Sequence, residues 1–342
     1  MEKRFLAFVT FAFLTVVPAT AADSASTKWT PPKTAWGDPD LQGTWTSDNL
    51  REVPLERPAQ FGTRRFLTDQ ELAARAKGVD EFQTEIIGKG VRPNAGYWAN
   101  RSGVDAAAAP PNWQEFSRRA SDLTSLVVDP PDGRVPALTP EAQALRASTN
   151  TLRNRRPETW TDRSMYDRCI TRGVIGSAFP VIYGNGTQIV QAPGWVAIRY
   201  EMIHETRLIP LDGRPHAAAG VKTYMGDARG HWEGNTLVVE TTNFVGGHNG
   251  AGVNGNGAAP YSDELRVVER FTRADDKTIQ YSATVVDPKT YTAPWTAAFP
   301  ITREAGYQIF EYACHEGNYA MHNLLSAARA EDKADAEKAP KH

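Results

Sequence analysis

The C-terminal half of the chain consists of short β-branched and aromatic runs separated by polar turns. Between residues 229 and 244, the turn Glu233-Gly234-Asn235-Thr236 leads directly into a β-branched run, which is the pattern of a hairpin followed by a strand. Further along, segments 265–272 and 278–286 flank a second polar turn at 273–277. The pattern therefore predicts a β-meander.

About eight strands are expected from Tyr183 onward, because helical periodicity is absent after Leu211 until His322. That number suits a closed or nearly closed antiparallel barrel. The predicted fold class is mainly β, an antiparallel lipocalin-like barrel with a helical and loop-rich N-terminal insert. The expected strands are 187–191, 195–210, 220–225, 237–244, 265–272, 278–286, 295–303 and 307–313.

The N-terminal half contains one more barrel motif and two helix starts. Gly43-Thr44-Trp45 resembles the Gly-x-Trp that opens the first strand of lipocalin-like barrels, where the indole closes the barrel's end. Thr68 and Glu71 form a capping box for a helix to about Lys77, and Thr139 is the expected N-cap of a second helix. The insert between Trp45 and the later strands is longer than an ordinary loop, which indicates a lid or wrapping subdomain.

The N-terminus has the pattern of a secretory signal peptide. Basic residues precede an apolar run at 5–17, and the small residues 19–21 follow it. The run is too short to span a bilayer, so no membrane span is expected after cleavage and the protein should be periplasmic or secreted. The expected divisions are a signal peptide at 1–21, an extended arm, first strand and insert at 22–175, the barrel core at 176–328 and a charged tail at 329–342.

Composition and motifs exclude several classes of function. A formal net charge of −2 gives no electrostatic basis for nucleic-acid binding. Cys169 and Cys314 are the two cysteines of an exported chain, so one disulfide is expected, with two buried thiols as the alternative. No metal spacing, nucleophile elbow or phosphate loop is present, and no cofactor is expected. A metal site built from His204, His231 and His315 on neighbouring strands stays open.

Three motifs together resemble a large, largely uncharacterised family of exported proteins from Gram-negative bacteria. They are HETRLIPLDGRPH at 204–216, GDARGHWEG at 226–234 and YACHEGN at 312–318. The resemblance covers residues 38–328 and implies a periplasmic or secreted β-protein. It implies no particular reaction, so a functional interpretation must come from the chemistry of the residues.

Residues 195–210 hold the first candidate site. Strand alternation puts Glu201, Glu205 and Arg207 on one face and Tyr200 and His204 on the other. One interpretation is a set of cross-strand ion pairs. The other is a charged face that lines a lumen or cleft, where Glu201 acts as a base and Arg207 binds an anion. The sequence does not decide which face points inward.

Polar loops at the strand ends supply the remaining candidates, because binding residues collect at such positions. Either these loops form a ligand site or their polar side chains anchor one another, and Trp232 is either a barrel plug or a stacking platform. In YACHEGN, a disulfide at Cys314 would hold His315 and Glu316 at the barrel rim as an acid/base pair. Alternatively, Glu316 and Asn318 cap the helix that follows. The candidates are Arg214, His216, Asp227, Arg229, His231, Trp232, His315, Glu316 and Asn318.

The resulting hypothesis is an exported protein that acts on a small organic molecule in a barrel cleft. Carboxylate/His acid-base catalysis by a lyase, isomerase or hydrolase would involve Glu201, His204, His315 and Glu316. The alternative is a non-catalytic periplasmic lipocalin-like ligand-binding protein, and a structural envelope protein is a third class. A cluster of arginines allows two interpretations. Its members are solvated or paired with nearby acids, or they form an entrance for an anionic ligand. Its members are Arg153, Arg155, Arg156, Arg163, Arg168 and Arg172.

Overall fold

The fold is described from a computed structural model, in residues 29–82, 84, 117–181, 183–246 and 261–338. The expected signal peptide, much of the insert, most of the Gly/Asn-rich loop and the last tail residues lie outside these ranges. No helix of the described residues is long and apolar enough to cross a membrane.

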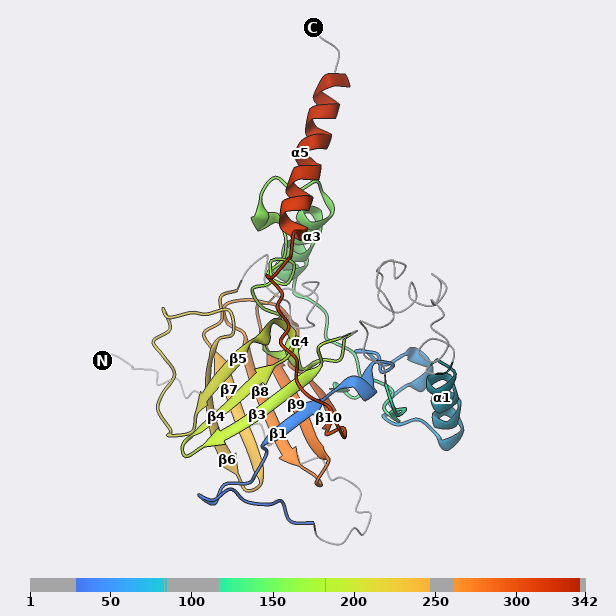
Figure 1. The fold of residues 1–342 in the computed structure, drawn as a ribbon, viewed down its shortest axis with the longest axis vertical. Helices are drawn as coiled ribbons and strands as arrows, with labels where there is room; N and C mark the ends of the chain where they lie inside the picture. The colour runs from blue at the N-terminus through green and yellow to red at the C-terminus, as the bar shows by residue number, and fades with distance from the viewer. Residues whose placement is uncertain (1–28, 83, 85–116, 182, 247–260, 339–342) are drawn as a thin grey trace, which may run out of the picture. The chain divides into compact units, whose positions relative to one another are not determined.

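An antiparallel sheet curls into a nearly closed barrel of nine strands in the order β5-β4-β3-β1-β10-β9-β8-β7-β6 (Figure 1). The predicted fold class, a mainly β antiparallel lipocalin-like barrel, is thus confirmed. A short strand from the insert, β2 (Val127–Asp129), also pairs with β10. The barrel strands are β1 (Gly43–Thr46), β3 (Gly186–Ala192), β4 (Trp195–Tyr200), β5 (Thr206–Pro210), β6 (Asp227–Glu233), β7 (Thr236–Thr242), β8 (Arg266–Arg273), β9 (Thr278–Val286) and β10 (Trp295–Thr302).

Strands β5 and β6 meet through side chains. Among the described residues no ladder joins them, yet Gly230 of β6 lies against Ile209 at the end of β5 and against Leu211. A Cβ on Gly230 would come within 2.8 Å of Ile209 Cγ2 and 2.6 Å of Leu211 Cδ2. Glycine is therefore needed here for close packing, and it brings the two edges of the sheet together.

The tryptophan of the Gly-x-Trp motif lies in the core against two arginines. Trp45 is fully buried, and the guanidinium carbons of Arg303 and Arg273 lie 4.6 Å and 5.7 Å from its ring centroid. These two arginines stand where β10 and β8 finish. Gly43 has a φ of +136°, and a Cβ there would collide with the Arg303 guanidinium. Gly43 thus leaves room for the Arg303 guanidinium to make a cation–π contact with Trp45.

The two predicted helix starts are confirmed. Thr68 Oγ1 accepts a hydrogen bond of 3.3 Å from Glu71 N, and Glu71 Oε2 accepts one of 2.8 Å from Thr68 N. Thr139 Oγ1 accepts from Ala142 N at 3.1 Å. The helices are α1 (Asp69–Phe82), α3 (Pro140–Asn154), α4 (Val174–Ala178) and α5 (Ala320–Lys338), with 3₁₀ turns η1 (Asp48–Leu50), η2 (Ala59–Phe61), η6 (Trp160–Asp162) and η7 (Met202–His204).

Three predicted strands differ from the structure. Segment 195–210 is not one strand but the β4–β5 hairpin, because Ile203 and His204 adopt φ values of 61° and 46° and reverse the chain at η7. Segment 220–225 contributes only an isolated bridge between Thr223 and Phe244. Segment 307–313 is extended but joins no ladder. Extended, apolar-rich sequence therefore occurs here without strand pairing.

Candidate functional site at the C-terminal strap

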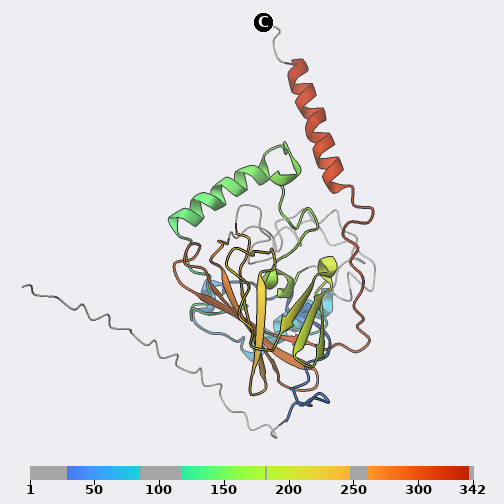
Figure 2. The ribbon, with the colours of Figure 1, turned by 90° about the vertical axis from the view of Figure 1, so that its left-hand side faces the viewer.

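Residues 303–319, here called the strap, connect β10 to α5. Figures 1 and 2 show the strap running along the outside of the barrel toward the end where α4 lies. The predicted disulfide is confirmed: Cys314 in the strap is bonded to Cys169, with 5.7 Å between their Cα atoms. Because the disulfide and several hydrogen bonds hold it, the strap covers a defined part of the barrel surface.

The carboxyl group of Glu201 lies under the strap. Glu201 follows β4 and is 5% exposed. Its Oε2 accepts a hydrogen bond of 2.7 Å from the hydroxyl of Tyr307, and its carboxylate also accepts from the backbone N–H of Phe310. Glu201 N in turn donates to Gly186 O at 2.8 Å. The carboxyl group is thus fixed by groups from both the barrel and the strap.

Burial raises the pKa of Glu201, and the nearby Asp48 carboxylate acts in the same direction. The hydrogen bond from Tyr307 opposes the increase without cancelling it. Such a carboxyl group exchanges a proton closer to neutrality than an ordinary glutamate does. A raised pKa combined with a defined hydrogen-bond partner is the usual property of a general acid or base.

Tyr307 connects Glu201 to an open groove of about 580 Å³. The groove runs between β1 and the start of the strap and is lined by Gln42, Gly43, Thr44, Arg303, Glu304, Ala305, Gly306 and Tyr307. Arg303 lies over Trp45 and donates from Nη2 to Gln42 O at 2.8 Å. A groove of this volume, with a cation and a phenol in its wall, is of the size that accommodates a small organic molecule.

The other predicted acid/base residues do not join Glu201. His204 is exposed, and its Nδ1 makes a 3.0 Å hydrogen bond with Tyr312 O in the strap. His315 and Glu316 are exposed strap residues near the disulfide. Asn318 Oδ1 accepts from Ala320 N at 2.9 Å, so the capping interpretation holds for this residue. The structure therefore places these side chains along the strap and not around one centre.

The polar loops form a network on the outer face of the barrel. Asp227 of β6 contacts His216 Nδ1 at 3.0 Å, Arg229 Nη1 at 2.6 Å and Ala217 N at 2.9 Å. Burial acts to raise the pKa of Asp227, but these three hydrogen bonds outweigh it and lower the pKa. His216 Nε2 also lies 3.4 Å from Glu240. The loop at 212–217 is consequently anchored to β6, as the structural alternative requires.

The remaining loop candidates are dispersed. Arg214 is exposed, pairs with Asp212 and lies 5.2 Å above the ring of Trp195. His231 is exposed and lies 3.2 Å from Glu233. Trp232 is half-buried and packs against the core, and its buried Nε1 has no partner among the described residues. This position agrees with a barrel plug.

Arg207 lies inside the barrel. Its Nη2 is 2.6 Å from Glu269 Oε2 and 3.1 Å from Thr241 Oγ1, and its Nη1 donates to Tyr200 OH at 3.1 Å. Tyr200 and Arg207 therefore share the inner face, and the predicted separation of these residues onto opposite faces is wrong. The hairpin turn at η7 shifts the alternation between them. Side chains fill this part of the interior.

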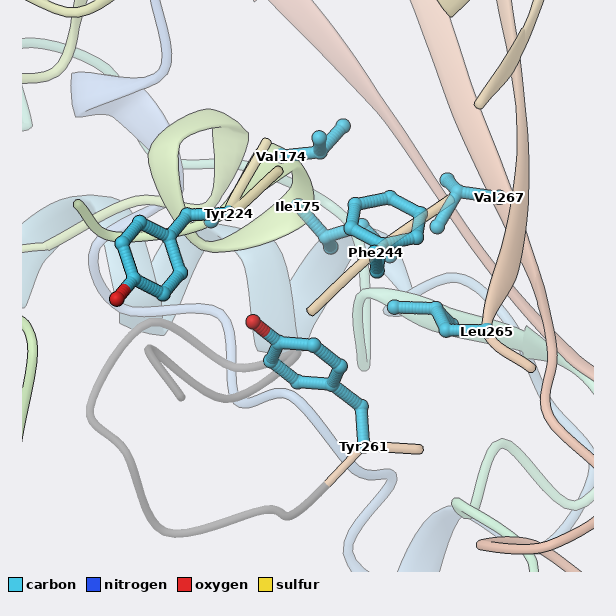
Figure 3. Close-up of a pocket in the computed structure, with 8 residues that line it drawn as sticks. Val174, Ile175, Tyr224, Phe244, Tyr261, Leu265 and Val267 are labelled. Atoms are coloured by element: carbon cyan, nitrogen blue, oxygen red, sulfur yellow. The ribbon is translucent and has the colours of Figure 1, made fainter. Parts of the chain in front are cut away.

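A small cavity occurs at the end of the barrel near α4. Its volume is about 10 Å³, and Tyr224, Phe244, Tyr261 and Leu265 are among the residues that line it. Figure 3 shows the phenol oxygens of Tyr224 and Tyr261 pointing to the same side. This volume holds about one water molecule. The groove at the strap is therefore the better candidate for an organic ligand.

Sequence reasoning missed Tyr307 and Arg303. Tyr307 meets Glu201 across 106 positions, and a pattern read along one strand cannot reveal such a contact. One signal could have indicated a cation near Trp45. Gly43 has no side chain, so it leaves room for a guanidinium group to lie over the indole ring, and Arg303 occupies that position.

Within the described parts of the chain, no group of three or more His, Cys, Asp or Glu residues could hold a metal ion. No protein-family model, curated protein or solved structure matches this chain.

Proposed function

We propose that the protein acts on a small polar organic molecule in the groove between β1 and the strap, with Glu201 and Tyr307 as an acid-base pair. The observation that carries the proposal is the buried Glu201 carboxyl group, which has a raised pKa and a 2.7 Å hydrogen bond from a phenol of the groove wall. Acid-base chemistry of this kind belongs to lyases, isomerases and hydrolases.

In this mechanism the phenol of Tyr307 touches the substrate and Glu201 lies behind it. The Tyr307 oxygen accepts a proton from the substrate while its own proton moves to Glu201 Oε2, so the charge gained by the pair equals the charge lost by the substrate. Reversal of the two transfers returns the proton to another substrate atom. Arg303 in the same groove provides a positive charge for a carbonyl or anionic oxygen that forms during the reaction.

The competing function is a non-catalytic carrier, the ligand-binding alternative. It requires the same groove but no proton transfer. The filled interior around Arg207 and Glu269 favours a ligand at the outer groove over one in a lumen, and this holds for both functions. What favours the enzyme is the pKa of Glu201, because a carrier gains nothing from a buried carboxyl group of raised pKa.

A ligand screen followed by paired variants tests the proposal. The mature protein is screened by thermal shift against sugars, organic acids and lactones, because a ligand of the folded state raises its melting temperature. Each hit is incubated with the wild-type protein, and products are identified by mass spectrometry. For a converted hit, Glu201→Gln and Tyr307→Phe are expected to lower turnover by about 10²-fold or more, with the thermal shift retained.

Glu311→Gln is the matched control, because Glu311 is an exposed glutamate of the same strap; its turnover should equal that of the wild type. Hits that bind but are never converted would favour the carrier. A melting temperature that responds to no compound of the panel would contradict the proposal.

A further inference from the structure

Arg172 differs from the other arginines of its segment. Arg156 contacts Glu331, Asp332 and Asp335 of α5, and Arg168 lies 5.1 Å above the ring of Trp160. Arg172 is only 3% exposed, and no salt bridge among the described residues includes it. Two of its nitrogens, Nε and Nη1, are buried without a hydrogen-bond partner in the described chain.

Three tyrosines surround this guanidinium group. Its carbon lies 5.6 Å from the ring centroid of Tyr166. The rings of Tyr183 and Tyr312 stack with centroids 5.8 Å apart and an interplanar angle of 15°. Burial raises the pKa of Tyr166 and of Tyr312, and the neighbouring Tyr183 adds to both increases. Tyr183 is hydrogen-bonded to both Tyr166 and Tyr312, which uses two of the three phenol protons and leaves one O–H that can donate to an anion.

The backbone around Arg172 is fixed in place. Glu205 accepts a 2.7 Å hydrogen bond from Thr171 Oγ1 and another from the backbone N–H of Arg172. Cys169, three positions earlier, is bonded to Cys314 of the strap, and Tyr312 belongs to the same strap. The guanidinium and the phenols are consequently held together before any ligand arrives, which lowers the entropic cost of binding.

A buried charge without a counterion is unfavourable, and the contact with Tyr166 offsets this cost only partly. Glu205 is already engaged by Thr171 and the backbone. We infer that Arg172, with the phenols of Tyr166, Tyr183 and Tyr312, forms a binding site for a small monocarboxylate. One guanidinium balances one negative charge, whereas a phosphate dianion would leave a buried excess. The inference does not depend on the groove at Glu201.

Thermal unfolding in the presence of benzoate or benzamide tests this site, because the two probes share a ring and differ in charge. Sodium benzoate should raise the melting temperature of the wild-type protein in a saturable way at constant ionic strength, and benzamide should not. Arg172→Gln should weaken benzoate binding by at least about tenfold. Arg168→Gln is the matched control and should bind benzoate like the wild type.

If Arg172→Gln does not fold, Tyr312→Phe serves as a second variant, since it removes one hydroxyl group at the half-exposed side of the cluster; a severalfold weaker benzoate response is expected. Equal responses to benzoate and benzamide would overturn the inference. A response to inorganic phosphate without one to benzoate would overturn the carboxylate assignment. A full benzoate response in Arg172→Gln would place the ligand elsewhere.

Discussion

Gly186 is the residue with the most restricted surroundings at the candidate site. It opens β3 directly beneath Glu201, and a Cβ at this position would collide with Glu201 Oε2 and lie 2.8 Å from Tyr307 OH. Both neighbours belong to the proposed acid-base pair. Glycine at 186 therefore determines how closely the carboxyl group can approach the sheet.

Gly186→Ala is expected to destabilise the folded state by about 1–3 kcal/mol, because an added methyl group must displace the Glu201–Tyr307 hydrogen bond. Urea denaturation measures the change in the free energy of unfolding. Gly220→Ala is the control, since nothing lies within 4 Å of a Cβ at that position. Equal stabilities of the two variants would contradict the close contact.

Glu205 predicts a pH dependence of stability. Burial raises its pKa, although Thr171 and Arg207 oppose the increase. The folded state therefore binds this proton more readily than the unfolded chain does, and the contribution of Glu205 to stability falls as pH rises from the ordinary pKa toward the raised one.

Because glutamine does not titrate, the stability of Glu205→Gln relative to the wild type should increase between about pH 4 and pH 8. Chemical denaturation at several pH values gives this difference directly. A difference that stays constant across the range would show that the pKa of Glu205 is the same in the folded and unfolded states.

Single residues were predictable where their role depends on neighbours in sequence. The Gly-x-Trp motif opens the first strand, and Thr68 and Thr139 cap helices, as their local motifs indicate. Glu201 was a candidate because of its charge in a strand-like run, but its partner Tyr307 was not predictable. Their contact depends on the path of the strap, which no local pattern encodes.

At the scale of elements, the strap shows that an extended segment can be held without strand pairing. Its attachments are the disulfide at Cys314, the Tyr307–Glu201 hydrogen bond and the contact between His204 and Tyr312. Each one joins the strap to residues 169–204. The disulfide is the covalent member of this set.

Replacing both cysteines by serine should therefore lower stability by roughly 2–4 kcal/mol, since the disulfide closes a long loop and restricts the unfolded chain; the two cysteines are 145 positions apart. Denaturation with and without a reducing agent measures the effect. The double variant should not respond to the reductant, and a wild-type protein equally insensitive to it would contradict the prediction.

The β4–β5 hairpin illustrates why element boundaries were harder to predict than element types. Residues 195–210 are extended almost throughout, and the break depends on positive φ at Ile203 and His204. A β-branched residue such as Ile203 strongly disfavours that conformation, and no glycine, asparagine or proline marks a turn there. The surrounding buried contacts of Met202 and Ile203 hold a turn that local preference would not select.

For the whole molecule, the central feature is an ion pair inside the barrel. Arg207 and Glu269 are 3% and 0% exposed in their side chains and lie 2.6 Å apart. Tyr281 also donates to Glu269 at 3.0 Å. A buried pair of this kind is held by mutual neutralisation, and each charge is costly without the other.

Arg207→Met alone should destabilise the protein by about 3–5 kcal/mol, because the buried carboxyl group of Glu269 would lose its partner. The double variant Arg207→Met/Glu269→Leu should recover part of this loss. A double-mutant cycle by urea denaturation measures the coupling, and simple additivity of the two single changes would contradict the interpretation.

The fold class was predictable because apolar and polar positions alternate along most strands, as in β9, where Ile279, Tyr281, Ala283 and Val285 face the interior. The filling of the interior was not, because Arg207 and Glu269 look like surface residues in sequence. Their burial depends on each other, across 62 positions.

The contact between Gly230 and Ile209 marks the seam at which the barrel closes. Every other neighbouring pair in the strand order is joined by backbone hydrogen bonds, whereas β5 and β6 are held by side-chain packing in the described residues. The barrel is thus a single curled sheet whose two edge strands, β5 and β6, pack against each other at their margins. Local opening would begin at these margins and leave β8, β9 and β10 hydrogen-bonded to one another, so the molecule can loosen on one side while the rest of the sheet stays intact.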